Sequence, residues 1–180
     1  MPGEFKTLSS RIVHEDRWMR LRLDAIERPS GAPGSYTVVE KPDFAVIAAI
    51  DGGMIHLVEQ YRYPVGGRYW ELPQGSWSGE GTLAAEELAA RELREETGLV
   101  ARAIRRIGFI HTAYGYSTQG CHIFHATELE HVGQALDAEE EDLVTRAVAV
   151  ADFAAMIRAG TITDATTIAA FAHLQLHDLV

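Results

Sequence analysis

The segment "RELREETGL" (residues 91–99) decides how the rest of the chain is interpreted. It places three carboxylates, Glu92, Glu95 and Glu96, close together in a stretch with helical character. Like charges three or four positions apart on a helix repel one another, so a positive partner is expected beside them. That partner is either arginine and solvent, or a bound metal ion.

Helical geometry separates the charges of this segment into two stripes. At about 100° per residue, Glu92 and Glu96 share a stripe with small alanines, whereas Arg91 and Glu95 lie together on the adjacent stripe. Arg91 can therefore pair with Glu95, and room is left beside Glu92 and Glu96. Oxygen ligands of high charge suit a hard cation such as Mg²⁺ or Mn²⁺.

A solvated helix face is the simpler interpretation, because most acidic helices are of that kind. The glycine-rich loop "QGSWSGEG" (residues 74–81) directly before the helix favours the metal interpretation instead. Such a loop can bring backbone amides and a carbonyl oxygen next to the carboxylates, which makes a phosphate and metal cradle.

The composition is that of an ordinary globular protein. Its 180 residues fit one domain, or one domain with a small appendage, and the longest apolar run, residues 44–50, is too short to span a bilayer. The net charge of -10 argues against binding to nucleic acid or to anionic membranes. The single cysteine, Cys121, excludes an internal disulfide framework and fits a reducing cytosol, so a cytoplasmic location is expected.

Residues 1–40 are expected to form a small β extension that packs on the main domain or on a partner subunit. Residues 17–26 alternate apolar and polar side chains as a half-buried strand does, and residues 36–40 form a second short strand. A turn rich in proline and glycine, residues 28–35, lies between them. The main domain is expected to span residues 41–180.

The main domain alternates strands with three helices. Two apolar runs, residues 44–50 and 54–61, flank "DGG" and predict a hairpin. Thr82 is the expected N-cap of the acidic helix and Gly98 its expected C′ residue. Further strands are expected at residues 68–73, 104–111, 121–127 and 143–150, and helices at residues 151–160 and 164–176. This order indicates an α+β or α/β layered fold.

The stretch "GSWSGEGTLAAEELAARELREETGL" (residues 75–99) resembles the Nudix box, G-x5-E-x7-R-E-U-x-E-E-x-G-U, where U is aliphatic. Its second half matches at every specified position, namely Arg91, Glu92, Leu93, Glu95, Glu96, Gly98 and Leu99. The first half departs from the pattern, because the segment from Gly75 to Arg91 is two residues longer and Leu83 stands where the glutamate belongs. Glu80 or Glu86 could compensate.

The resemblance extends to the ADP-ribose pyrophosphatase subgroup. It is carried by "VEQYRYPVGGRYWELPQG" (residues 58–75) and by residues 143–176, which include "AGTITDATTIAA". The family implies an α/β/α sandwich with a mixed sheet between helices and a small N-terminal antiparallel β extension that helps to build a homodimer. It also implies Mg²⁺- or Mn²⁺-dependent hydrolysis of the pyrophosphate bond in a nucleoside diphosphate linked to another group. For ADP-ribose or an ADP-sugar, the products are AMP and a sugar phosphate.

The resemblance assigns roles to the acidic residues. Glu92 and Glu96 are the leading metal ligands, with the backbone carbonyl of Gln74 as a further candidate. Glu95 assists, and Arg91 orients the carboxylates. The loop "DAEEED" (residues 137–142) supplies Glu139 as general base and Glu141 as metal ligand, and a shift by one residue to Glu140 stays open.

Substrate contacts are expected from the box glycine, Gly75, and from Arg62 and Arg68, which could reach a phosphate or the distal ribose. The loop "AYGYSTQG" (residues 113–120) keeps the family glycine as Gly115. It carries Gln119 where ADP-ribose enzymes often have a glutamate, so Gln119 could set a different substrate preference.

Two alternatives stay open at this point. The chain could be a Nudix pyrophosphatase for another nucleotide, such as an oxidised dNTP, a dinucleoside polyphosphate or another nucleotide sugar. It could also be a nucleotide-sensing module without turnover, although the complete set of Arg91, Glu92, Glu95 and Glu96 argues against a pure sensor.

Overall fold

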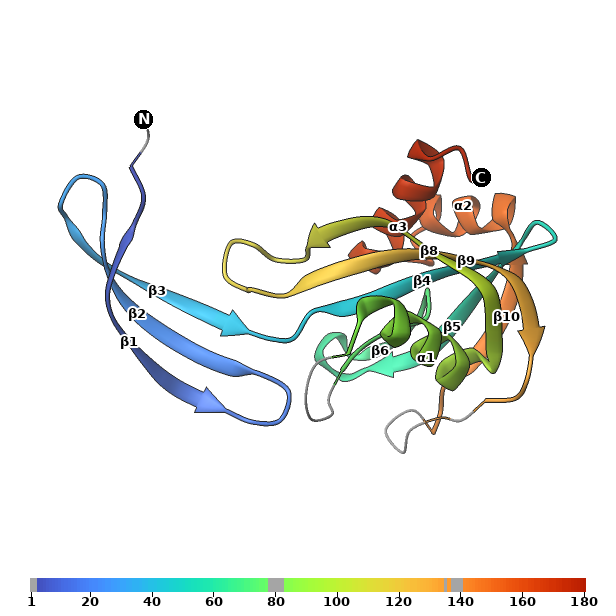
Figure 1. The fold of residues 1–180 in the computed structure, drawn as a ribbon, viewed down its shortest axis with the longest axis horizontal. Coiled ribbons are helices and arrows are strands. Elements are labelled where there is room, and N and C mark those ends of the chain that lie inside the picture. The colour runs from blue at the N-terminus through green and yellow to red at the C-terminus, as the bar shows by residue number, and fades with distance from the viewer. Residues whose placement is uncertain (1–2, 78–82, 135, 137–140) are drawn as a thin grey trace.

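The computed structural model describes residues 3–77, 83–134, 136 and 141–180 and contains two separate sheets (Figure 1). The N-terminal sheet is antiparallel, with the strand order β1-β2-β3. Its strands are β1 (Lys6–Glu15), β2 (Arg20–Glu27) and β3 (Pro33–Glu40). Figure 1 shows this sheet reaching away from the main body, as the expected β extension.

The described part of the main domain forms a seven-stranded mixed sheet with the order β10-β5-β4-β9-β8, in which β6 pairs with β5 and β7 with β4. The pair β4–β9 is parallel and the other pairs are antiparallel. The strands are β4 (Phe44–Asp51), β5 (Met54–Arg62), β6 (Gly67–Glu71), β7 (Gln74–Ser76), β8 (Leu99–His111), β9 (Gly120–His131) and β10 (Val144–Ala149). A 3-10 turn, η1 (Tyr63–Val65), precedes β6.

Helices cover both faces of this sheet. Helix α1 (Ala85–Thr97) packs on one face, where Leu93 meets Ile47 of β4 in a buried cluster. Helices α2 (Val150–Arg158) and α3 (Ala165–Leu176) pack on the other face, where Phe153 and Leu174 join Val46. Because β4 is buried on both faces, its sequence is continuously apolar instead of alternating. The layered α/β/α fold expected from the sequence is confirmed.

The predicted hairpin of β4 and β5 is confirmed. The two strands pair at the turn, at Ile50–Ile55 and Asp51–Met54, after which β4 runs beside β7 and β9. Two other local expectations need correction. Residues 74–76, expected in a loop, form strand β7, because they pair with β4. Helix α1 has Ala84 and not Thr82 at its N-cap, and Thr82 lies outside the described residues.

The ends of helices α1 and α3 are stabilised in three different ways. Helix α1 begins without a side-chain cap, but its first turn carries Glu86 and Glu87, which face the positive end of the helix dipole. It ends at Gly98, whose left-handed φ of 71° is typical of a C-terminal glycine, as expected. Helix α3 begins at Asp164, whose carboxylate accepts the backbone N–H of Thr167.

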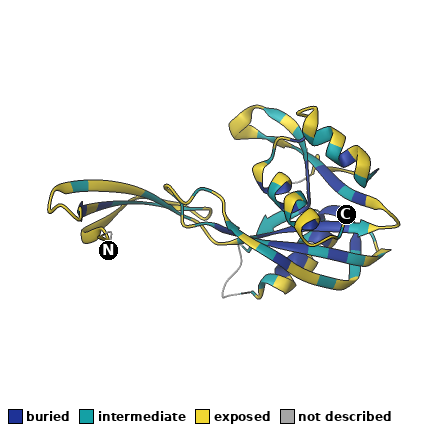
Figure 2. Cartoon of the chain, turned by 90° about the horizontal axis from the view of Figure 1, so that it is seen from above, coloured by how far each residue is buried: buried dark blue, intermediate teal, exposed yellow. Residues whose placement is uncertain are grey.

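The N-terminal sheet is mainly exposed (Figure 2). Every residue of β1 is exposed, and the apolar side chains Phe5, Leu8, Ile12, Val13 and Trp18 are all more than two-fifths open to solvent. A surface of this kind in a small sheet is typical of a protein interface. None of the helices that the structure describes is long and apolar enough to cross a bilayer.

Candidate active site

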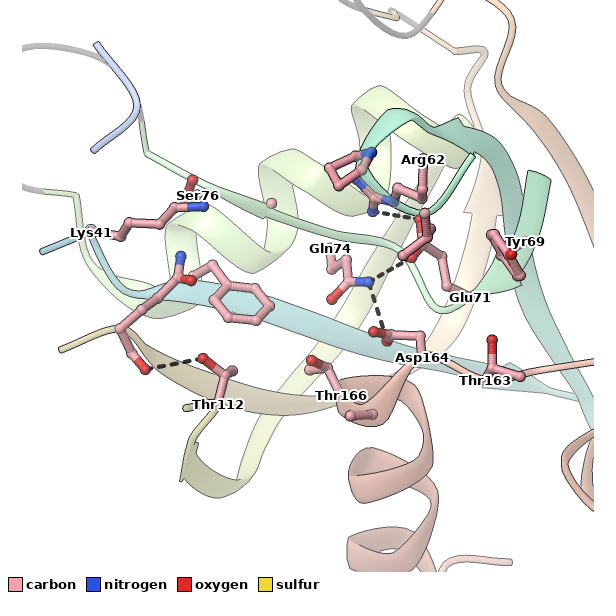
Figure 3. Close-up of a pocket in the computed structure, with 16 residues that line it drawn as sticks. Lys41, Arg62, Tyr69, Glu71, Gln74, Ser76, Thr112, Thr163, Asp164 and Thr166 are labelled. Atoms are coloured by element: carbon pink, nitrogen blue, oxygen red, sulfur yellow. Dashed lines mark hydrogen bonds and ion pairs between the residues drawn. The ribbon is translucent and has the colours of Figure 1, made fainter. Parts of the chain in front are cut away.

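A cavity of about 660 Å³ lies beside β7 and the beginning of α3 (Figure 3). It brings together segments that are far apart in the sequence: the start of β4, the η1 turn, strand β6, the loop between β8 and β9, and the N-terminus of α3. Its walls are formed by Lys41, Phe44, Arg62, Pro64, Val65, Tyr69, Glu71, Gln74, Gly75, Ser76, Thr112, Gln119, Thr163, Asp164, Ala165 and Thr166.

Strand β7 lies between this cavity and the carboxylates of α1. Glu96 is fully buried, and its Oε2 accepts the backbone N–H of Gln74 at 3.0 Å. The carboxylate of Glu92 lies so close to Gly75 that a Cβ at that position would be 2.3–2.7 Å from its atoms. A side chain at position 75 would therefore push the Glu92 carboxylate away from the strand. This contact holds two carboxylates against backbone that also lines the cavity.

The remaining residues of the acidic segment form the pair expected from the sequence. Arg91 donates through Nε to Oε1 of Glu95 at 2.7 Å, one helical turn away. The guanidinium carbon of Arg91 also lies 5.0 Å from the ring centre of Trp77, a cation–π contact. Arg91 is therefore held on both sides next to the carboxylates that it is proposed to orient.

A chain of polar side chains crosses the far end of the cavity (Figure 3). Arg62 donates to Oε1 of the buried Glu71 at 2.5 Å. The side-chain amide of Gln74 donates to Oε2 of Glu71 at 3.0 Å and to Oδ2 of Asp164 at 3.4 Å. Burial raises the pKa of Glu71, and Arg62 acts in the opposite direction. The charge of Arg62 is thus met by a carboxylate inside the protein.

We expect Glu71→Gln to change how stability depends on pH. Burial raises the pKa of Glu71 above its ordinary value of 4.5, so the folded protein keeps a proton that the unfolded chain has lost. Between the ordinary and the raised value, acidification therefore stabilises the wild type, and the glutamine variant lacks this gain. Chemical denaturation of both proteins from about pH 7 to about pH 4 measures the difference. If the wild type instead loses stability relative to the variant on acidification, the pKa of Glu71 is not raised in the folded protein.

Two other predicted substrate residues take part in contacts outside the cavity. Arg68 donates to Oε2 of Glu59 at 2.9 Å and to the carboxylate and backbone carbonyl of Asp142. These partners raise the pKa of Arg68. Gly115 lies at an exposed loop, where its carbonyl accepts the hydroxyl of Tyr36 from the N-terminal sheet at 2.7 Å.

Gln119 lines the cavity as expected, and its side-chain amide donates to the carbonyl of Pro42 at 2.9 Å. Glu141 is exposed and directly precedes Asp142. Because Arg68 of β6 donates to both Asp142 and Glu59 of β5, it connects the segment that carries Glu141 to these two strands. The predicted base Glu139 and its alternative Glu140 lie outside the described residues.

Sequence reasoning missed the groups at the far end of the cavity, Glu71 and Asp164 above all. Asp164 was recognisable as the start of a helix, but no pattern places it beside Gln74. Glu71 is a charged residue in a short strand that ends two residues before Pro73, which gives a weak sign of a buried polar network. Lys41, Phe44 and the three threonines Thr112, Thr163 and Thr166 carry no motif.

The donors near β7 meet part of what a divalent metal needs. Among the residues that the structure describes, no three His, Cys, Asp or Glu side chains form a complete metal-binding group. Glu92 and Glu96 nevertheless supply oxygen donors of high charge next to neighbouring residues of β7, Glu92 against Gly75 and Glu96 against the backbone N–H of Gln74. An oxygen-only set of this kind fits a hard cation.

Comparisons with known proteins agree with this geometry. Residues 5–39 match the description "Nucleoside diphosphate sugar hydrolase N-terminal domain", and residues 40–171 match "NUDIX domain". The chain is 35% identical over 168 residues to an ADP-ribose pyrophosphatase of Mycobacterium tuberculosis, covering 92% of this chain and 81% of that protein. It is 30% identical over 178 residues to an ADP-ribose pyrophosphatase of Bacillus subtilis, covering 97% and 95%.

A solved structure described as "Crystal structure of ADP compounds hydrolase" has the same fold. It superposes with a TM-score of 0.86 at 18% sequence identity, and the match covers 97% of this chain and 94% of that one.

Proposed function

Because the chain belongs to the Nudix family, we propose that it hydrolyses the pyrophosphate bond of ADP-ribose or an ADP-sugar in a Mg²⁺-dependent reaction. The products are AMP and a sugar phosphate. The observation that carries this proposal is the contact of Glu92 and Glu96 with strand β7 at Gly75 and Gln74. Gly75 and Gln74 also line the cavity, so the two carboxylates lie directly behind its wall. The two identically named relatives support the choice of ADP-ribose.

The carboxylates of α1 would hold the metal in this proposal. Glu92, Glu96 and the carbonyl of Gln74 would be its ligands, with Glu141 as a further one, and Mn²⁺ would be the alternative ion. A divalent ion at such a site neutralises charge on the pyrophosphate oxygens and lowers the pKa of bound water. Oxygen ligands that come from a rigid helix and strand hold their positions before the substrate arrives.

The remaining roles belong to side chains. Glu139 takes a proton from the water that attacks one phosphorus, and the bond from that phosphorus to the bridging oxygen breaks. The bridging oxygen leaves with the other phosphate. Glu95 assists, and Arg91, held between Glu95 and Trp77, keeps the carboxylates in register.

The amide at Gln119 favours a second candidate, a pyrophosphatase for another nucleoside diphosphate compound. Gln119 lines the cavity through a neutral amide that is already bonded to Pro42. A substrate that relies on a negatively charged carboxylate at position 119 would bind this protein less well than a substrate that can be bound by the neutral amide of Gln119.

We propose that the N-terminal sheet forms a homodimer through its exposed apolar side chains. Ile12→Glu in β1, where Ile12 is 44% exposed, would place a charge in that interface. We expect the variant to weaken dimerisation by at least about 10-fold and to leave the folded monomer stable. Light scattering coupled to gel filtration measures the mass over a range of concentrations. A wild type that is monomeric throughout contradicts the dimer.

A substrate panel tests the activity. With Mg²⁺ present, release of monophosphate is measured from ADP-ribose, ADP-glucose, GDP-mannose, diadenosine polyphosphates and oxidised dGTP. The proposal predicts the highest kcat/KM for ADP-ribose or ADP-glucose. Preference for another compound moves the chain to the second candidate, and binding without turnover of any compound supports a sensor.

A further inference from the structure

We propose that the side-chain carboxamide of Gln74 determines substrate specificity by accepting a hydrogen bond from a donor group of the nucleotide, either a hydroxyl of the terminal sugar or the exocyclic amine of the base. This inference rests on the proposed function, and it concerns the side chain of Gln74 and not its backbone. It follows from the way in which Glu71 and Asp164 hold the amide on two sides.

The orientation of the carboxamide is set by its two neighbours. Its nitrogen lies 3.0 Å from Oε2 of Glu71 and 3.4 Å from Oδ2 of Asp164. Oδ2 of Asp164 also accepts the backbone N–H of Thr167 at 2.7 Å, so this oxygen is an acceptor. An amide carries two donor hydrogens on nitrogen and an acceptor oxygen, and the flipped orientation would bring that oxygen against carboxylate oxygens.

With the nitrogen committed to two carboxylates, the oxygen of Gln74 is left for the cavity. Figure 3 shows this oxygen turned away from both Glu71 and Asp164. The group that the protein offers at this point is therefore an acceptor, and the ligand group that it matches is a donor. Strand β7 fixes the position of the amide, because Gln74 pairs with Val46 in the centre of the sheet.

The charge at this end of the cavity also favours an uncharged donor over a phosphate. Glu71 and Asp164 carry two negative charges, and Arg62, the cation beside them, is bonded to Glu71. The neighbouring side chains Thr163 and Thr166 are neutral. Lys41 lies at the opposite end, near Ser76 (Figure 3), and suits the phosphates better.

Gln74 also links this end of the cavity to the α1 carboxylates. Its backbone N–H donates to Glu96 at 3.0 Å, while its side chain reaches toward Asp164. A substrate that bonds to the side-chain oxygen is thereby placed at a fixed distance from the carboxylates. Specificity and the position of the scissile bond are coupled through a single residue.

The test compares Gln74→Ala with the wild type on three compounds. These are ADP-ribose, its inosine analogue, which lacks the exocyclic amine, and methyl-ADP, which lacks the terminal sugar. Gln175→Ala, which removes an exposed glutamine of α3, is the matched control. Thermal unfolding of each variant checks the fold, and Gln74→Glu, which adds a negative charge without changing size, is a second variant.

We expect Gln74→Ala to lower kcat/KM for ADP-ribose by about 10-fold and to leave it nearly unchanged for the analogue that lacks the bonded donor. An unchanged value for the inosine analogue identifies the amine, and an unchanged value for methyl-ADP identifies the hydroxyls of the terminal sugar. Equal losses on all three compounds, or no loss on any, overturn the inference.

If the wild type cleaves none of the three compounds, the proposed hydrolysis fails separately. The same comparison is then made on binding constants measured by calorimetry. Selective loss of affinity in Gln74→Ala still supports the acceptor role, and equal or absent loss still overturns it.

Discussion

Glu96→Gln is expected to lower kcat by about three orders of magnitude while leaving the fold intact. Glu96 is fully buried, and its Oε2 accepts the backbone N–H of Gln74. Glutamine has the same shape, and its side-chain oxygen can accept the same N–H, so packing and this hydrogen bond are kept. The charge that would hold a divalent ion is lost. Steady-state turnover of ADP-ribose with saturating Mg²⁺ measures the effect.

The matched control is Glu87→Gln on the same helix. Glu87 is exposed in the first turn of α1, so its change removes an equal charge from the helix without touching the cavity. We expect this control to keep nearly all activity. A Glu96→Gln variant that retains more than about a tenth of the wild-type kcat would show that Glu96 is not a metal ligand.

The second large effect is expected for Gly75→Ala. The added Cβ would lie 2.3 Å from Oε2 and 2.4 Å from Cδ of Glu92, which is closer than atoms in van der Waals contact. The Glu92 carboxylate is the far end of a flexible side chain, so it must swing aside while the backbone stays in place, and we expect a stability loss below about 1 kcal/mol. Because Glu92 and Gln74 then separate, kcat falls by about 100-fold. Urea denaturation and steady-state kinetics measure the two quantities.

Gly34→Ala is the control for this substitution. The new Cβ would meet the flexible end of Arg28 at 3.0 Å, which can move aside. We expect its kcat to equal that of the wild type. If Gly75→Ala retains the wild-type kcat, the close approach of the Glu92 carboxylate to this glycine is not required for turnover.

Local patterns in the sequence predicted most of the elements. Periodicity and turn residues located the strands on both sides of "DGG", the acidic helix and its end at Gly98, and the helix that begins after Asp164. The layered fold followed from their order. These features are local, because each depends on side chains within one or two turns of the chain.

Pairing between distant segments was not predictable in the same way. The parallel pair of β4 and β9 and the short strand β7 depend on contacts between residues that no local pattern connects. The N-cap of α1 was misplaced because Thr82 is a good capping residue, whereas the helix begins only at Ala85.

In the candidate site too, contacts between residues close in the sequence were predictable, and contacts between distant segments were not. Arg91 and Glu95 were predicted to pair from their spacing alone, and they do. The network of Arg62, Glu71, Gln74 and Asp164 joins four elements, so it required the structure. Arg62 was expected to reach a phosphate or the distal ribose, and in the structure it lines the cavity and donates to Glu71.

The central claim is metal-dependent cleavage of a pyrophosphate by the carboxylates beside β7. The most direct test is to incubate the purified chain with ADP-ribose, with Mg²⁺ or with EDTA, and to identify the products by chromatography. The account predicts AMP and ribose 5-phosphate in equal amounts with Mg²⁺, and no product with EDTA or with Glu96→Gln. Equal product formation with EDTA, or full activity of Glu96→Gln, would contradict it.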